Sequence, residues 1–312
     1  DVGLVKMDIL GIRNLSIMAD GIKLIEKLRG VKIDVYTIPL DDKKTFEMLA
    51  RGETFGVFQM ASSGMTRYLM ELEPTRVEDL MIMVALYRPG PMSNIPEYIA
   101  RKKGAKPVTY YHPKMQSFLK PSFGVLVYQD DLLSTALELA GYSWETVDKF
   151  RKAVGKKIPE EMAKQHVIFV DGCMKYSEMS KEAAEGLWNL FEPFQGYGFN
   201  KAHAASYGMV SYWTAYLKAN YQVEYMAALL SAEASNTDKL VEAIAECDRM
   251  KLRILPPDVN ESLTGFTVVG EAIRFGLGAI KNVGEAAVTA ILEEREKGSF
   301  KNLSDFCTRT DT

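Results

Sequence analysis

The stretch KAHAASYGMVSYWTAYLK, residues 201–218, contains no charged residue between its two terminal lysines and is the longest such run in the chain. A membrane-spanning helix needs about 20 predominantly apolar residues, and this run is shorter. It also contains the hydroxyl-bearing residues Ser206, Tyr207, Ser211 and Tyr212. We therefore interpret it as a buried helix of a globular protein, and we expect no membrane partner.

The composition of the chain is ordinary for a folded globular protein. The 312 residues are 47% hydrophobic and 25% charged, which indicates neither disorder nor a fibrous class. A chain of this length is expected to form about two or three structural units. The net charge of −3 differs from the basic balance typical of dedicated nucleic-acid binders, so local clusters of charge must decide that question.

The first residues and the cysteines predict a cytoplasmic location. Residues 1–10 lack the basic stretch, apolar run and small-residue cleavage site of a secretory signal. Cys173, Cys247 and Cys307 lie far apart and form no C-x-x-C pair, which argues against a zinc knuckle and a disulfide framework. We expect the three thiols to be reduced.

Apolar residues recur at helical spacing along most of the chain, which predicts a mainly α fold. The predicted helices cover approximately residues 14–28, 42–51, 61–72, 76–87, 129–140, 143–154, 159–176, 180–191, 203–220, 222–234 and 237–250. Short strands are predicted at residues 2–10, 124–128, 266–269 and 272–275. The prolines of RPGP, residues 88–91, and LPPD, residues 255–258, interrupt the helical pattern, and we predict a domain boundary near residue 255.

Lys6 and Asp8 stand two positions apart on the first predicted strand, so their side chains leave the same face of it. Taken alone, such a pair is more typical of a structural ion pair than of a catalytic site. Two-metal phosphoryl chemistry needs several carboxylates, and the chain contains no D-x-D pair. Asp130 and Asp131 point about 100° apart on a helix, which favours charge complementarity at a helix start over a shared metal site.

The densest cluster of positive charge is KFRKAVGKK, residues 149–157, with five cations in nine residues. A solvated helix end is one interpretation, because Lys and Arg favour a helix C-terminus. The density of charge, with no carboxylate inside the stretch, instead favours binding of a triphosphate or of backbone phosphates.

The stretch GYGFNKAH, residues 196–203, combines flexible glycines, two aromatic rings, an amide, a cation and an imidazole before the charge-free helix. Aromatic rings stack on bases, a lysine meets phosphate, and a bulky side chain near the sugar excludes a 2′-hydroxyl. A turn that merely packs into the core is the alternative interpretation.

The stretch GLGAIKNVGEAA, residues 276–287, has the pattern of a helix, a short hairpin with Val283-Gly284 at the turn, and a second helix. Backbone N–H groups at the start of the second helix offer an anion site, and glycine lets a phosphate approach closely. An ordinary pair of packed helices is the alternative.

These motifs occur in one order with KMDILG (6–11), YRPGPM (87–92) and VYQ (127–129), and together they resemble the C-family bacterial replicative polymerases, the DNA polymerase III alpha subunits. The resemblance covers almost the whole chain. It implies that residues 1–20 are the end of the palm and residues 21–255 the fingers. Residues 256–312 would then hold short strands and the start of the helix-hairpin-helix region. The expected fold is therefore a helical fingers domain with a short palm-derived strand before it and a small α+β segment after it.

The resemblance also implies roles for individual residues. Asp8 would be a catalytic carboxylate that binds Mg²⁺, together with further carboxylates of the palm, and Lys6 would lie beside the reacting phosphates. The nucleotide contacts would be Arg88, Arg151, Lys152, Lys156, Lys157, Tyr197, Phe199, Lys201 and His203, with His203 near the sugar. The DNA contacts would be Lys281, Asn282, Val283 and Gly284.

The function implied is template-directed addition of deoxynucleotides to a primer 3′ end during bacterial chromosome replication. The family's paired palm aspartates are not in this sequence, so we expect the isolated chain to be inactive. The implied partners are primer-template DNA, deoxynucleoside triphosphates and, in the full enzyme, a sliding clamp, a clamp loader and a proofreading subunit. The alternative function is a non-catalytic helical DNA-binding scaffold with a helix-hairpin-helix module.

Overall fold

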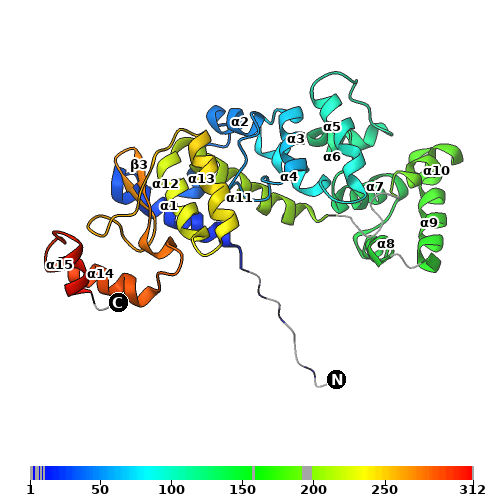
Figure 1. The fold of residues 1–312 in the computed structure, drawn as a ribbon. Coiled ribbons are helices and arrows are strands. Elements are labelled where there is room, and N and C mark those ends of the chain that lie inside the picture. Colours follow the sequence, from blue (N-terminus) through cyan, green and yellow to red (C-terminus); the bar gives the residue numbers. More distant parts are fainter. Residues whose placement is uncertain are drawn as a thin grey trace. The chain divides into compact units, whose positions relative to one another are not determined.

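The computed structural model describes residues 11–156, 159–191 and 199–310, together with Gly3, Met7 and Ile9. The chain divides into two compact units (Figure 1). The first unit combines the described residues up to 45 with residues 54–58 and 213–310. The second unit combines residues 46–53 with the described part of 59–212. Helices α2 (Lys43–Ala50) and α11 (Lys201–Asn220) contribute residues to both units.

The second unit is built from helices. They are α3 (Ser63–Leu72), α4 (Val77–Leu86), α5 (Ile95–Lys102), α6 (Gln116–Leu119), α7 (Gln129–Ala140), α8 (Trp144–Lys156), α9 (Pro159–Ser177) and α10 (Lys181–Asn189), with part of α2 and of α11. Short 3-10 turns at Pro91–Asn94, Pro113–Met115 and Lys120–Ser122 connect them.

An aromatic cluster forms the core between α7, α8, α9 and α10. The ring of Phe150 stacks against Phe169 with 6.1 Å between centroids, and Phe169 meets Phe191 edge-on at 5.1 Å. Trp188 touches all three rings. Because Phe150 belongs to α8, the basic end of that helix is anchored by the apolar residues interleaved with its charges.

The first unit combines helices with a small sheet. Its remaining helices are α1 (Arg13–Arg29), α12 (Gln222–Glu233), α13 (Thr237–Arg249), α14 (Glu285–Glu296) and α15 (Leu303–Arg309). Its strands are β1 (Ile254–Leu255), β2 (Thr267–Val269) and β3 (Ala272–Arg274). The strand order is β1-β3-β2, with β1 parallel and β2 antiparallel to β3. Figure 1 shows α12 next to this sheet.

Helix α12 is the centre of the first unit, because α1, α13 and β2 all pack against it. Two charged groups near it are buried with partners. Arg29 of α1 donates two hydrogen bonds to Glu224 of α12, at 2.5 and 3.1 Å. The Nζ of Lys218, a fully buried residue, lies 2.8 Å from the carbonyl oxygen of Phe55 and 2.5 Å from Glu246 Oε1. Buried charges are thus matched, as folding in a low dielectric requires.

The structure confirms the mainly α prediction, and each helix predicted between residues 14 and 250 is present with ends shifted by two residues or fewer. Sequence patterns missed α5, α6 and α15, which are too short to show a clear periodicity. The predicted strand at 124–128 is wrong: this segment forms only one isolated bridge, Tyr128 to Phe199. The prediction missed β1, which directly precedes the prolines taken as a break. The strand predicted at 2–10 lies outside the described residues.

The buried-helix interpretation of residues 201–218 holds for the later part of α11. Ser211, Tyr212, Thr214 and Leu217 are fully buried, whereas Lys201 and His203 at its start are exposed. Nowhere in the described part of the chain does a helix combine the length and apolar character that a membrane crossing requires. Cys173 and Cys247 are buried free thiols, and Cys307 is an exposed one.

The crossing of α7 and α9 gives a test of the packing. A Cβ on Gly172 would lie 2.2 Å from the carbonyl oxygen of Ala140, which is backbone and cannot rotate away. Gly172→Ala should therefore lower the free energy of unfolding by about 2 kcal/mol. Gly155→Ala is the matched control: its Cβ would meet only Gln129 Nε2 at 3.8 Å, so better helix propensity should raise stability by about 0.5 kcal/mol. Urea unfolding followed by circular dichroism measures both, and equal stabilities would contradict the close approach.

Candidate functional site

Several of the sequence-predicted site residues lie outside the described ranges. These are Lys6, Asp8, Lys157 and Tyr197, and for Lys156 only the helical backbone is described. The candidate site is therefore built from Arg88, Arg151, Lys152, Phe199, Lys201 and His203, all in the second unit.

A column of stacked side chains stands at the start of α11. The guanidinium carbon of Arg88 lies 3.6 Å from the centroid of the Phe199 ring, a close cation–π contact. Phe199 meets the His203 ring edge-on at 5.1 Å, and His203 lies 4.1 Å from the ring of Tyr207. Burial lowers the pKa of Arg88 from its ordinary value, so the cation stands in a partly desolvated place. We call these four residues the aromatic column.

The aromatic column follows from spacing on a helix. Residues 199, 203 and 207 are four apart, so their side chains share one face of α11 and of the turn before it. Asn200 begins the helix: its side-chain oxygen accepts the backbone N–H of His203 at 2.9 Å, a helix cap. Sequence analysis missed Tyr207, although its i+4 spacing from His203 would have indicated it.

The start of α7 holds the aromatic column in place. Tyr128 and Phe199 form an isolated parallel bridge, in which the N–H of Gln129 donates to the carbonyl oxygen of Phe199 at 3.0 Å. Asp130 then accepts the backbone N–H of Lys201 at 2.9 Å. These two hydrogen bonds join the start of α7 to the start of α11, although the segments lie about 70 residues apart in the sequence. We call this contact the 128–199 bridge.

Asp131, the next residue of α7, binds the backbone of the segment before the helix. It accepts the backbone N–H groups of Val127 and Tyr128, at 2.9 and 2.8 Å. Burial raises the pKa of Asp131 to about 6, although these two hydrogen bonds oppose the shift. Asp130 and Asp131 thus bind different partners in the first turn of α7.

The basic end of α8 differs in one respect from the sequence interpretation. Asp148, one position before the cluster, binds both Arg151 at 2.7 Å and Lys152 at 2.6 Å. The stretch itself contains no carboxylate, but Arg151 and Lys152 pair with the one just before it, since residues three and four apart are neighbours on a helix. Hydrogen bonds from Lys152 and Arg151 hold the pKa of Asp148 below its ordinary value. The side chains of all three residues are 43–58% exposed, and such pairs are weak enough for a phosphate to compete.

Helix α8 ends near the aromatic column. A Cβ on Gly155 would lie 3.8 Å from the side-chain nitrogen of Gln129. The backbone of Gln129 in turn bonds Phe199. The described parts of the 149–157 cluster and of the 196–203 stretch are therefore brought to neighbouring positions in one unit. The Nζ of Lys201 lies 5.8 Å from the centroid of the Tyr128 ring.

The predicted DNA contacts form a turn in the first unit. Lys281, Asn282, Val283 and Gly284 connect a 3-10 turn, Leu277–Ala279, to α14. Asn282 has a φ of +66°, and Gly284 begins α14 with no atom within 4 Å of the place a Cβ would take. The helix predicted before the turn is only this 3-10 turn, because Gly276 and Gly278 pack against the backbone at Thr264 and Gly265.

Among the residues that the structure describes, no three His, Cys, Asp or Glu side chains gather closely enough to hold a metal ion. Asp8 lies outside the described residues.

Comparison with known proteins identifies the family. The family described as "Bacterial DNA polymerase III alpha subunit finger domain" matches residues 14–177, more than half of the chain. A second, described as "Helix-hairpin-helix motif", matches residues 251–312. The chain therefore belongs to the finger-domain family of bacterial DNA polymerase III alpha subunits, and the resemblance found in the sequence is confirmed.

Similar whole proteins all carry the name DNA polymerase III subunit alpha. The chain is 49% identical over 314 residues to the protein of Thermus aquaticus, a match that covers 99% of this chain and 26% of that protein. It is 45% identical to the protein of Saccharopolyspora erythraea, covering 100% and 26%. It is 44% identical to that of Escherichia coli strain K12, covering 99% and 28%. The chain thus spans about a quarter of the length of these relatives.

The hydrogen bond between Asp130 and Lys201 gives a test of how the site is held. Asp130→Ala leaves the first N–H of α11 without its acceptor, and it should lower the free energy of unfolding by about 1 kcal/mol. Asp130→Asn keeps an acceptor oxygen and should lose less than half of that. Thermal unfolding of the two variants is the measurement, and an Asn variant as unstable as the Ala variant would show that the hydrogen bond is not the cause.

Proposed function

We propose that this chain holds nucleotide and DNA in a template-directed DNA polymerase that extends a primer 3′ end during bacterial chromosome replication. Its family and its relatives support this function. The observation that carries it is the aromatic column beside the basic end of α8, because a nucleotide needs stacking surface and cations at adjoining places.

Each part of the site has a role in this proposal. Arg151, Lys152, Lys156 and Lys157 would bind the triphosphate, and Arg88 would add a cation close to it. Phe199, with Tyr197, would face the base or sugar. His203 would lie near the sugar and exclude a 2′-hydroxyl by its bulk. Tyr207 would hold the His203 ring in place, since the two ring centroids are 4.1 Å apart.

In the reaction, the primer 3′-hydroxyl attacks the α-phosphate of the deoxynucleoside triphosphate, and pyrophosphate leaves. The cations of α8 would bind the phosphate oxygens on which negative charge collects, which positions the α-phosphate for in-line attack. Asp8 would contribute one ligand to a Mg²⁺ site, with further carboxylates from the palm of the whole subunit and Lys6 beside the phosphates. That metal would supply charge stabilisation at the attacking and leaving oxygens.

The turn at residues 281–284 would contact the phosphates of duplex primer-template DNA without reading its bases. In the whole enzyme, which we propose is cytoplasmic, the partners would include a sliding clamp, a clamp loader and a proofreading subunit. A non-catalytic DNA-binding scaffold would use the same turn but would have no use for the aromatic column.

Nucleotide binding separates these two functions. We expect a deoxynucleoside triphosphate with Mg²⁺ to bind the chain in isothermal titration calorimetry. The double variant Arg151→Ala with Lys152→Ala should weaken binding about tenfold or more, because each cation makes charge-assisted hydrogen bonds to phosphate.

Two controls accompany this measurement. Lys164→Ala removes an exposed cation whose ion pair with Glu161 resembles that of Arg151, and it should leave the affinity unchanged. Asp148→Ala frees both cations and should tighten binding. A wild-type chain that does not bind the nucleotide would favour the scaffold, and an Asp148→Ala variant that binds more weakly would show that the cations do not face phosphate.

The turn before α14 allows a test of the proposed DNA contact. Gly284→Glu should weaken binding of duplex DNA, and the loss should shrink as salt rises, because it adds bulk and negative charge where a phosphate would lie. Gly284→Ala should bind nearly as the wild type does, since φ is −79° and no atom lies within 4 Å of the added Cβ. Fluorescence anisotropy with a labelled duplex measures both. Equal affinity of the Glu variant at low salt would exclude the turn as a contact.

A further inference from the structure

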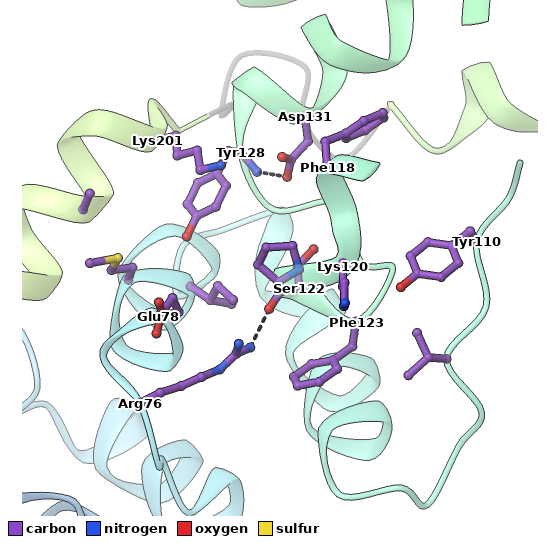
Figure 2. A pocket seen from close by; sticks show the side chains of 15 residues that line it. Arg76, Glu78, Tyr110, Phe118, Lys120, Ser122, Phe123, Tyr128, Asp131 and Lys201 are labelled. Atoms are coloured by element: carbon purple, nitrogen blue, oxygen red, sulfur yellow. Dashed lines mark hydrogen bonds between the residues drawn. The ribbon is translucent and has the colours of Figure 1, made fainter. Parts of the chain in front are cut away.

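A cavity of about 750 Å³ lies within the second unit, apart from the aromatic column (Figure 2). Its volume falls in the range of roughly 300–1,000 Å³ that is typical of small-ligand sites. Lys201 and Ala205 of α11 line it. Side chains two positions apart on a helix point about 200° apart, so His203 and Tyr207 leave the opposite face of α11. The cavity and the column are therefore separate sites on two faces of one helix.

The walls of the cavity are unusually aromatic for a surface site. Tyr110, Phe118, Phe123 and Tyr128 all line it, and Figure 2 shows their rings arranged around it. Except for Tyr128, these rings are only half-buried, so they keep surface available for a ligand. Burial raises the pKa of Tyr128, which keeps its hydroxyl protonated as a donor. Such walls suit the flat face of a nucleobase, because stacking needs only a π surface.

Three cations line the same cavity. Lys120 and Lys201 are exposed, and neither forms an ion pair with another described residue. Arg76 lies 5.0 Å from the centroid of Phe123 and donates to the carbonyl oxygen of Pro121 at 2.5 Å. Aromatic rings with cations close to them are the combination found where proteins hold unpaired nucleic acid.

Arg76 is fixed in this position by a buried carboxylate. Asp79 is fully buried and accepts hydrogen bonds from Arg76 Nε at 3.3 Å and from the hydroxyl of Tyr98 at 2.7 Å, with Lys102 at 2.8 Å. Burial disfavours its charge, but these partners hold the pKa of Asp79 below its ordinary value. Burying Asp79 with its cationic partners costs desolvation free energy. In return, the guanidinium of Arg76 is held at the cavity in one orientation.

We propose that this cavity binds one unpaired nucleotide, with the base among the four aromatic rings and the phosphate near Lys120, Arg76 and Lys201. Glu78 and Asp131 also line the cavity, so three cations face two carboxylates there. That balance suits a single phosphate group better than a triphosphate. The ligand chemistry is that of a nucleoside monophosphate, either free or as one unit of a single DNA strand.

The test measures binding of two probes to the chain by calorimetry at low salt: dAMP, and an unpaired strand of deoxyadenosines. Lys120→Glu is the main variant, because Lys120 is exposed, has no ion pair with a described residue and lies outside the aromatic column. We expect it to weaken binding about tenfold. Lys181→Glu makes the same charge change at an exposed residue that does not line the cavity, and it should bind as the wild type does.

A second variant tests the walls of the cavity. Val108 is exposed and lines the cavity, so Val108→Trp should fill part of it and weaken binding without disturbing the core. Tighter binding of dAMP than of the strand would identify a free nucleotide as the ligand, and the reverse would identify a strand. The proposal would be overturned if neither probe binds the chain. It would also be overturned if the Lys120→Glu variant binds the probes as tightly as the wild type does.

The two proposed nucleotide sites can be tested independently of each other. Lys120→Glu should leave the affinity for a triphosphate with Mg²⁺ unchanged, and Arg151→Ala with Lys152→Ala should leave dAMP binding unchanged. If the double variant loses dAMP binding while Lys120→Glu keeps it, dAMP binds at the basic end of α8 and the cavity is not a site. If triphosphate binding is absent while Lys120→Glu still weakens dAMP binding, the cavity stands without the proposed polymerase site.

Discussion

The 128–199 bridge is the contact on which the candidate site depends. It joins Tyr128, the residue before α7, to Phe199, two residues before α11, and it is held by the hydrogen bonds from Gln129 to Phe199 and from Lys201 to Asp130. The aromatic column begins at the bridged residue Phe199. Helix α8 approaches the same place through Gln129. The bridge itself uses backbone atoms, and the side chain of Asp130 reinforces it by accepting the N–H of Lys201.

The bridge also separates two environments. On one face of α11, His203 and Tyr207 continue the aromatic column. On the other face, Lys201 and Ala205 line the cavity beside Tyr128. One short junction thus fixes both surfaces, and a ligand that displaced Tyr128 or Lys201 would act on the position of Phe199. Energetic coupling between two sites requires such an element, which both ligands can bias.

Charged side chains are arranged in two different ways around these sites. Asp79 is buried, and its cations are fixed by several hydrogen bonds, so Arg76 has little freedom. At the end of α8, Arg151 and Lys152 share the half-exposed Asp148, and solvent weakens both pairs. The first arrangement holds a cation in one place, and the second leaves cations free to turn to an anionic ligand.

The sequence by itself determined where the helices lie, the order of the motifs and the family, because helical periodicity and motif spacing are local properties. The aromatic column was predicted in part: Phe199 and His203 belong to one short motif, whereas the contact of Arg88 with Phe199 spans more than 100 residues. Only the tertiary structure decided that residues 124–128 make a single bridge instead of a strand. Only the fold shows that Asp148 binds the basic cluster, and that Arg76, Lys120 and Lys201 share a cavity. These features depend on how distant backbone segments pack, and no local pattern of residue types records that packing.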